Sequence, residues 1–319
     1  PAFVNGTQQK AYEGVSMLYS FDDGKAAERH TTQYFEMVGN RGIYHKGWTA
    51  VTKHRTPWET GAIKTIPFDD DVWELYDTNS DWTQAHDLSK EMPEKLHELQ
   101  RLWLIEAVKY NVVPLDDRLS ERFNPDLAGR PQLVRGNRQL LYGGMRGLSP
   151  HSVVNVFNKT HALTAEVVVP ETGAEGVILA TGGITGGFSL YAKGGKLKYC
   201  YNLCGLQHFF VEGDRVIPAG KHQVRMEFAY DGGGLAKGGT VSLFIDGQKV
   251  GDGRIDMTEP FAFSADETVD VGLEAGSPVS PDYGSKGNAF NGEVNWVEID
   301  ADKEALDQDH ILTGAERFR

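Results

Sequence analysis

The sequence predicts an α+β fold class, in which a small antiparallel sheet with a packed helix is followed by an all-β jelly-roll sandwich. In the first part, short runs of aromatic and β-branched residues alternate with Gly, Asn and Lys turns, and an amphipathic stretch follows. In the second part, apolar residues recur at every second position between glycine turns, which is typical of strands packed on one face. We therefore expect a first domain at 1–118, a linker at 119–150, a sandwich at 151–300 and a charged tail at 301–319.

Length and charge limit the function classes. A chain of 319 residues can bury two cores. Its 32 Lys and Arg against 45 Asp and Glu give a net charge of −13, which disfavours non-specific binding to nucleic acid because the phosphates are repelled. No apolar run approaches the roughly 20 residues that a membrane helix needs. We expect neither nucleic acid nor a membrane as a partner.

The first predicted sheet is a meander. Its strands are expected at 33–38, 41–45, 48–52 and 73–77, with turns at Gly39-Asn40 and Lys46-Gly47. Residues 1–20 are interpreted as a strand-like entry, in which the apolar residues Val15, Met17 and Tyr19 lie two apart. The loop at 53–72, with Pro57 and Pro67, is long enough to suggest a role at a site.

A helix is expected after the meander. Ser89 can cap it, and Pro93 is tolerated in its first turn. The apolar residues Leu96, Leu99 and Trp103 follow at three- and four-residue spacings and predict one buried stripe. The helix should lie across the meander as the second layer of a small α+β unit.

The linker lacks strong periodicity and is rich in Pro, Gly and Arg. Arg is suited to bidentate recognition of sulfate or carboxylate, but arginines on an acidic protein also form surface and interdomain ion pairs. Both interpretations stay open for the six arginines between residues 111 and 151. They are Arg118, Arg122, Arg130, Arg135, Arg138 and Arg146.

The second domain is predicted to be a β-sandwich of many short strands. Asp246-Gly247 is a strong signal for a two-residue hairpin turn. The segments at 220–234 and 238–255 are similar to concanavalin/laminin-G-like jelly rolls, a similarity that concerns fold more than function. Strands are expected at 152–156, 161–169, 176–180, 188–192, 196–202, 207–211, 223–230, 240–245, 248–250, 269–273 and 293–299.

Ordered motifs in the first domain carry a family resemblance. They are the segments 39–43 (GNRGI), 47–51 (GWTAV) and 73–77 (WELYD), joined by Asn79-Ser80-Asp81, His86-Asp87-Leu88 and Pro93. This series resembles the C-terminal subdomain of the sulfatase family, within the alkaline-phosphatase-like superfamily. The segments 30–37 (HTTQYFEM) and 114–118 (PLDDR) are similar to bacterial arylsulfatases in particular.

The resemblance implies a sulfuric ester hydrolase whose reactive groups lie elsewhere. Sulfatases use a Cys or Ser in C-x-P-x-R, oxidised to formylglycine, as the nucleophile, and they bind calcium through aspartates of an N-terminal domain. Neither Cys200 nor Cys204 is followed by x-P-x-R, and no G-x-S-x-G elbow is present, so no catalytic residue is assigned. The chain is then expected to be the C-terminal part of an arylsulfatase, inactive alone. Its partners would be the N-terminal catalytic part of the same protein, which holds Ca²⁺, and a small aryl or sugar sulfate ester.

Three side chains are candidates for the rim of the substrate pocket. His30 stands before the meander, and Lys53 and His54 stand just after its third strand. An imidazole can donate to a sulfate oxygen or, when charged, balance its charge. The resemblance places such loops at the pocket, whereas the residues alone are equally well explained as structural or exposed. The cysteines are interpreted as small core residues, and the acidic runs at 22–23 and 69–71 as solvated turns.

Two rival functions stay open. The sandwich could be a carbohydrate-binding module, with calcium or sugar held at Asp231 to Gly234 or at Asp282-Tyr283-Gly284, although both segments also suit ordinary turns. The enzyme could instead hydrolyse a phosphodiester or phosphonate. The opening PAFVNGTQQK has no signal-peptide pattern, so a soluble protein is expected and its compartment, cytoplasmic or periplasmic/secreted, is left open.

Overall fold

The computed structural model describes residues 1–56, 66–129, 133–134 and 136–302, and these divide into two compact units. The first ends at Leu119 and the second begins at Ser120. The predicted tail beyond residue 302, Trp58 and two of the linker arginines lie outside the described residues. Among the residues that are described, no helix has the length and apolar character needed to span a membrane.

The first unit contains the predicted antiparallel meander with a helix packed on it. The strand order is β3-β4-β5-β6. The strands are β3 (Thr32–Met37), β4 (Asn40–His45), β5 (Trp48–Thr52) and β6 (Trp73–Asp77). Gly47 sits in the second turn at φ +84°, and a Cβ there would collide with the Asn79 side chain, so the turn requires glycine.

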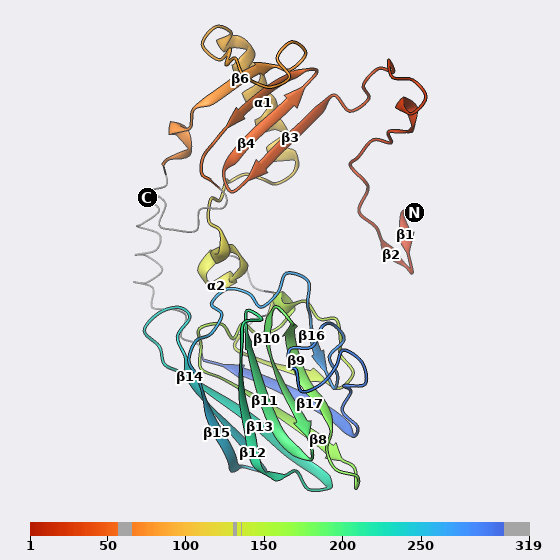
Figure 1. The fold of residues 1–319 in the computed structure, drawn as a ribbon, viewed down its shortest axis with the longest axis vertical. Coiled ribbons are helices and arrows are strands. Elements are labelled where there is room, and N and C mark those ends of the chain that lie inside the picture. The colour runs from red at the N-terminus through yellow and green to blue at the C-terminus, as the bar shows by residue number, and fades with distance from the viewer. Residues whose placement is uncertain (57–65, 130–132, 135, 303–319) are drawn as a thin grey trace. The chain divides into compact units, whose positions relative to one another are not determined.

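Helix α1 (Pro93–Lys109) covers one face of this sheet, and in Figure 1 it lies behind the strands. Its buried residues Leu99 and Trp103 pack on Ile43 and Leu75 of the strands. Trp103 Nε1 also donates to Phe35 O at 3.1 Å, which fixes the helix to the edge strand. The predicted Ser89 cap is wrong: the helix begins directly at Pro93, and Ser89 Oγ instead donates to Asp87 at 2.8 Å.

The N-terminal segment is not the strand-like entry that the alternation predicts. It forms only a two-residue hairpin of β1 (Phe3–Val4) and β2 (Thr7–Gln8) and a short turn of helix η1 (Leu18–Ser20). Large apolar side chains along it are exposed, among them Tyr12, Met17 and Phe21. Alternation alone did not make a strand because this segment finds no neighbouring strand among the described residues.

The second unit is a sandwich of two antiparallel sheets, as predicted (Figure 1). Its described strands form a five-stranded sheet, β12-β11-β10-β9-β16, and a six-stranded sheet, β15-β14-β13-β8-β17-β7. The five-stranded sheet consists of β9 (Gly176–Gly183), β10 (Gly186–Lys193), β11 (Lys196–Leu203), β12 (Gln207–Val216) and β16 (Val269–Val271). The six-stranded sheet consists of β7 (Arg138–Tyr142), β8 (His161–Val169), β13 (Gly220–Tyr230), β14 (Gly239–Ile245), β15 (Gln248–Ile255) and β17 (Glu293–Ala301).

The core of the sandwich lies between the sheets. Inward side chains such as Leu163, Val297 and Met226 from one sheet meet Leu179, Leu190 and others from the second, and all of these are essentially unexposed. The apolar area that these side chains remove from water contributes roughly 25 cal/mol per Å² and is the main stabilising term of the unit.

The predicted linker is part of this unit rather than a spacer. It contains η3 (Ser120–Phe123), α2 (Pro125–Ala128) and β7, and Leu141 of β7 pairs with Val297. The predicted strand at 152–156 is wrong, because the chain there forms η4 (Pro150–Ser152) and an irregular segment. Gln139 holds that segment through Ser152 O at 3.0 Å and Val154 N at 3.0 Å.

Candidate functional site

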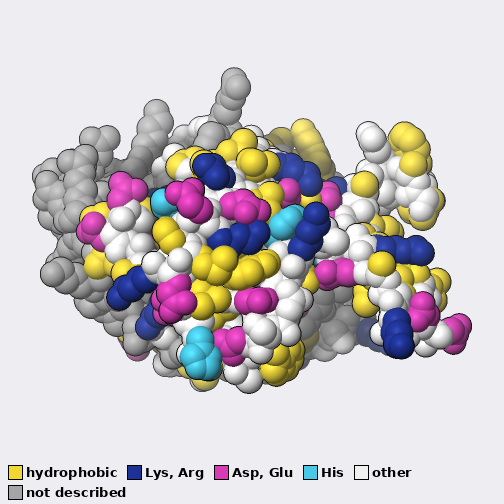
Figure 2. Space-filling view, turned by 90° about the horizontal axis from the view of Figure 1, so that it is seen from above, with side chains coloured by type: hydrophobic (Ala, Val, Ile, Leu, Met, Phe, Trp, Pro, Cys, Tyr) yellow, Lys and Arg dark blue, Asp and Glu magenta, His cyan; other side chains and the backbone are white. Residues whose placement is uncertain are grey.

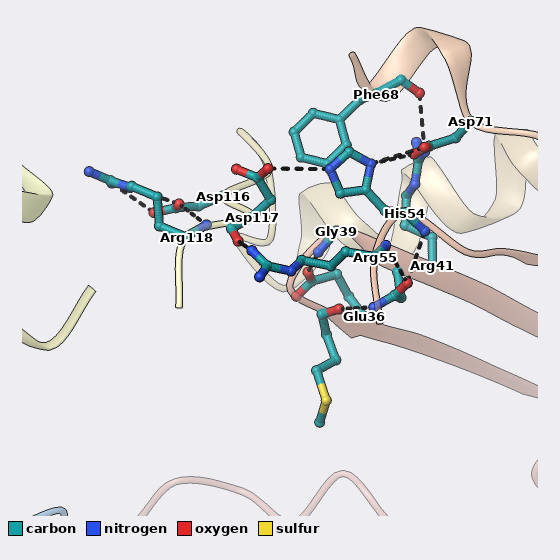
Figure 3. Close-up of polar contacts among 12 residues, drawn as sticks. Glu36, Gly39, Arg41, His54, Arg55, Phe68, Asp71, Asp116, Asp117 and Arg118 are labelled. Atoms are coloured by element: carbon teal, nitrogen blue, oxygen red, sulfur yellow. Dashed lines mark hydrogen bonds and ion pairs between the residues drawn. The ribbon is translucent and has the colours of Figure 1, made fainter. Parts of the chain in front are cut away.

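His54 lies in a buried polar cluster at one end of the first sheet (Figure 3). Its Nδ1 is 2.9 Å from Asp71 Oδ1, and its Nε2 is 3.3 Å from Asp117 Oδ2. The ring stacks on Phe68, with 4.3 Å between ring centroids. Only 1% of the His54 side chain and none of that of Asp71 is exposed.

Two arginines complete this cluster. Arg41 is ion-paired with Asp71 and donates to Phe68 O at 3.2 Å. Arg55 donates to Asp117 O at 2.8 Å. The cluster therefore joins the end of β5 to the turn η2 (Phe68–Asp70) and to the segment after α1. Buried charges of both signs that are paired in this way hold segments together, and removing one partner leaves the other uncompensated.

The three predicted pocket residues are not gathered at one place. His30 precedes β3, whose first residue Thr32 pairs with His45, whereas His54 follows β5, whose last residue Thr52 pairs with Arg41. The two histidines thus lie at opposite ends of the sheet. His30 Nε2 is 3.0 Å from Gln33 Oε1, and Lys53 is exposed beside His54. Both ring nitrogens of His54 face carboxylates, so the geometry gives this residue a structural role. Its role toward a substrate stays a prediction.

The face of the first sheet opposite α1 is partly apolar and exposed. Phe35 and Met37 of β3 point to it and are 56% and 62% exposed. Phe35 lies beside Gly42 and Val51 on the neighbouring strands. Figure 2, turned by 90° and seen from above, does not look onto this face; on the side that it shows, acidic, basic and hydrophobic side chains are intermixed. An exposed apolar strip on a sheet is a common mark of a surface that another polypeptide covers.

The two turns predicted to hold calcium or sugar already have partners. Asp231 is ion-paired with Arg254, whose Nη1 donates to Asp231 Oδ1 at 2.8 Å. Asp282 accepts from Tyr191 Oη at 2.7 Å and is ion-paired with Lys198. Among the described residues, no three His, Cys, Asp or Glu side chains are arranged to hold a metal. Calcium is thus expected only through the family resemblance, which assigns it to the N-terminal domain.

The structure shows ion pairs for two of the linker arginines and gives the burial of both cysteines. Arg118 pairs with Asp116 and Arg138 with Asp300, both at 2.8 Å, as the ion-pair interpretation expected for them. Cys200 is buried in the sandwich, as predicted. Cys204 is not a core residue, because it occupies the β11–β12 turn at φ +53° and is exposed.

The outer face of the five-stranded sheet, called here the covered face, lies under a long loop. Residues 272–292 cross it, and Val279 packs there on Val177, Tyr191 and Cys200. Tyr283 meets the Tyr191 ring edge-on at 5.2 Å between centroids. Glu274 is 3% exposed, and burial raises its pKa to about 7. The loop is fixed as a structural layer on this sheet.

The outer face of the six-stranded sheet, called here the platform face, is exposed and mixed in character. Register pairs Trp296 of β17 with Tyr142 of β7 on one side and with Glu166 of β8 on the other. Tyr142 is 54% exposed and Trp296 is half-buried. A bulge in β17 between Val294 and Trp296 changes the phase of the strand at this point.

Polar side chains continue the platform face across the next strands. Thr164 of β8 lies between Glu298 of β17 and Arg225 of β13. Arg225 binds Thr164 and also Glu227, the latter at 2.8 Å. Asn295 in the bulge donates to Glu166 at 2.9 Å. The face thus offers an aromatic strip beside a fixed row of hydrogen-bonding groups.

Sequence reasoning missed Tyr142 and Trp296, although a signal was present. In β17 the residues Val297, Ile299 and Ala301 face the core, so Trp296 stands out of phase with them, among the outward carboxylates. A large aromatic residue on the polar side of a strand is informative. Tyr142 was hidden because β7 was assigned to the linker.

The sandwich also contains a cavity of about 470 Å³. Phe157, Phe188 and Phe263 line it together with the strand residues Leu179 and Val269. Nearby, His161 is buried among aromatic rings, and burial lowers its pKa to about 4. Among the described lining residues, the acidic side chain is that of Glu267, and it is engaged by Ser277 N at 3.2 Å. The described lining is mostly apolar and aromatic, which suits an uncharged apolar group.

Comparisons with known proteins give no family for this chain. No protein-family model and no curated protein matches it. Solved structures that resemble it include the CBM40 module of a Ruminococcus gnavus IT-sialidase bound to α2,3-sialyllactose, at 13% identity and a TM-score of 0.35 over 58% of this chain and 98% of that one. Domains LG4-5 of mouse laminin α1 match at 15% identity and a TM-score of 0.31, over 56% of this chain and 42% of that one. A leech intramolecular trans-sialidase matches at 13% identity and a TM-score of 0.34, over 57% and 28%. The sandwich described above is defined by its own strand order and core, independently of these likenesses.

Proposed function

We propose that the β-sandwich of this chain is a carbohydrate-binding module whose ligand lies on the platform face. The observation that carries the proposal is the strip of exposed Tyr142 and half-buried Trp296 beside the polar pair Arg225 and Glu227. The buried Thr164 lies next to this pair and is hydrogen-bonded to Arg225. Sugar rings present an apolar C–H face and a rim of hydroxyls, so they require an aromatic surface next to hydrogen-bonding groups. The platform face provides both on rigid strands.

The two kinds of group have separate roles in this proposal. The rings of Tyr142 and Trp296 would remove apolar sugar surface from water, and the arrangement on paired strands costs little ordering entropy on binding. Arg225 donates and Glu227 accepts, and their mutual contact at 2.8 Å holds both in place before a ligand arrives. The face would bind without performing chemistry.

Calorimetric titration against a panel of soluble oligosaccharides, with and without calcium, tests the proposal. Wild-type chain should bind at least one oligosaccharide, and Trp296→Ala should weaken it about tenfold or more. Phe210→Ala is a matched control, because Phe210 is 44% exposed on β12 of the other sheet. Equal losses from both variants, or no binding to any member of the panel, would overturn the proposal.

A second candidate function rests on a different observation, the exposed apolar strip of Phe35 and Met37 on the first sheet. It agrees with the sulfatase resemblance, in which this unit is the C-terminal part of an arylsulfatase and the strip is covered by the N-terminal catalytic part. Sulfate-ester hydrolysis would then use a formylglycine and Ca²⁺ held by that part. Lys53 and His54 would stand near the rim of the pocket, and His30, at the opposite end of the sheet, would not.

Two measurements test this second candidate. The chain alone should not hydrolyse p-nitrophenyl sulfate, because no nucleophile is assigned among its residues. The coding sequence upstream of Pro1 should contain C-x-P-x-R. A different nucleophile motif there would favour the phosphodiester or phosphonate alternative, and turnover by the isolated chain would contradict the candidate directly.

A further inference from the structure

The charged residues of the platform face are already paired with one another. Lys221 lies 2.9 Å from Glu166, and Arg138 lies 2.8 Å from Asp300. Arg225 is 2.8 Å from Glu227. Each of these three cations therefore already has a carboxylate beside it, and that carboxylate would repel an incoming anion.

The balance of charge on this part of the face is negative. The cations Arg138, Lys221 and Arg225 stand against four carboxylates, so three minus four gives −1. The carboxylates are Glu166, Glu227, Glu298 and Asp300. Hydrogen bonds from Lys221 and Asn295 lower the pKa of Glu166, which keeps it ionised near neutral pH.

The carboxylates retain capacity to accept hydrogen bonds. Each has two oxygens with about four lone-pair sites, and the ion pairs of Glu298 and Asp300 with Arg138 occupy only some of these sites. Glu298 and Asp300 are 27% and 34% exposed. Hydroxyl and ammonium groups can donate to such oxygens, whereas a sulfate ester or a carboxylate can only accept. The complement of this face is a donor-rich ligand.

We propose that the platform face selects donor-rich glycans, both neutral hydroxylated ones and cationic amino sugars, and disfavours sulfated or carboxylated ones. The inference rests on the proposed carbohydrate-binding function and adds its ligand class. Because these charges are largely exposed, the discrimination is moderate, about fivefold at low salt, and it weakens as salt is added. A sandwich attached to a sulfatase would then hold unsulfated stretches of a polymer.

A matched pair of ligands tests the inference. A sulfated carrageenan oligosaccharide and its chemically desulfated counterpart share one backbone, and both are titrated into the whole chain at 20 mM and 150 mM salt. The desulfated form should bind about fivefold tighter at ~20 mM salt and by a smaller factor at ~150 mM. The double variant Glu298→Gln/Asp300→Asn should remove the difference by improving binding of the sulfated form. Glu171→Gln, in an exposed turn outside the face, is the control.

The outcomes separate this inference from the proposal beneath it. If the sulfated form binds as well as or better than the desulfated form, and Trp296→Ala weakens both, the ligand class is wrong and the binding function stands. If neither form nor a chitosan oligosaccharide binds, the binding function itself fails. Circular dichroism of each variant shows whether a loss comes from misfolding.

Discussion

The two outer faces of the sandwich are built by the same strand alternation but end in opposite environments. On the covered face, Val279 and Glu274 of the loop at 272–292 lie over Tyr191 and Cys200, and all four side chains are buried. On the platform face, Tyr142 and Leu140 of β7 are 54% and 42% exposed. The difference shows that outward residues of one face are buried and contribute to stability, whereas outward residues of the other face, such as Tyr142, are open to solvent.

The strongest way to break this comparison is a charge under the loop. Val279→Asp would bury an unpaired carboxylate in a cluster that contains no cationic side chain. We expect it to lower the free energy of unfolding by about 3 kcal/mol or more. Tyr142→Ser on the platform face should cost about 1 kcal/mol or less, because 54% of that side chain is already exposed. Calorimetry of the sandwich transition in each variant measures both. Similar losses would mean that the loop does not stabilise the fold.

Thiol labelling compares a covered residue with an exposed one inside the same molecule. Burial raises the pKa of Cys200 to about 12 and also hides its sulfur, whereas Cys204 lies exposed in a turn. A thiol reagent should modify Cys200 about 100-fold more slowly than Cys204 in the native chain. Val279→Asp should reduce the difference between the labelling rates of Cys200 and Cys204, because it loosens the loop over Cys200. The single variants Cys200→Ser and Cys204→Ser assign the two rates by mass spectrometry, and comparable native rates would show that the loop is open.

The pH dependence of stability should carry the signature of Glu274. Burial, followed by the charges of Asp270 and Glu267, raises its pKa from 4.5 to about 7. Folding therefore retains a proton that the unfolded chain releases. The contribution is complete below about pH 4.5 and declines as the pH rises to about 7, by on the order of 2 to 3 kcal/mol.

Glu274→Gln should flatten part of that slope, as followed by denaturant unfolding from pH 4.5 to 8. Glu259 contributes to the part that remains with the same sign, because burial also raises the pKa of its carboxyl to about 7. His161 contributes with the opposite sign below about pH 6.5, because burial lowers its pKa to about 4. Glu212→Gln is a suitable control, since hydrogen bonds from Lys196 and Lys198 lower the pKa of that exposed residue. An unchanged slope in Glu274→Gln would show that its carboxyl does not titrate in this range.

Turn residues in the sequence predicted the hairpins. The strand β7 and the buried loop at 272–292 were not predicted, because they depend on pairing and packing with distant segments. The turns at Gly47 and at Asp246-Gly247 lie where their residue types placed them. β7 was missed because Leu141 becomes an inward residue only by pairing with Val297, far along the chain. The loop at 272–292 has no period of its own, since its burial depends on β9, β10 and β11.

The candidate residues show the same limit. His54 could be selected from its place after the meander, but its partner Asp117 lies 63 residues away, so its engagement by two carboxylates was not visible in the sequence. Trp296 carried a readable signal through its phase in β17. Its neighbour Tyr142 could be found only once the six-stranded sheet was assembled.

The smallest expected effect is a change in the free energy of unfolding that has opposite signs for a hydroxyl removed from each face. Ser189 lies in the covered face with 0% exposure, and its hydroxyl has no well-formed hydrogen bond among the described residues. Thr164 lies on the platform side and is hydrogen-bonded to Arg225. Removing an unsatisfied buried hydroxyl relieves a desolvation penalty, whereas removing a bonded one loses the bond. Ser189→Ala should therefore leave stability unchanged or raise it by about 0.5 kcal/mol, and Thr164→Ala should lower it by about 0.5 to 1 kcal/mol. Denaturant unfolding at fixed pH resolves the two, and a clear loss in Ser189→Ala would show that its hydroxyl is bound under the loop, for example to Tyr283.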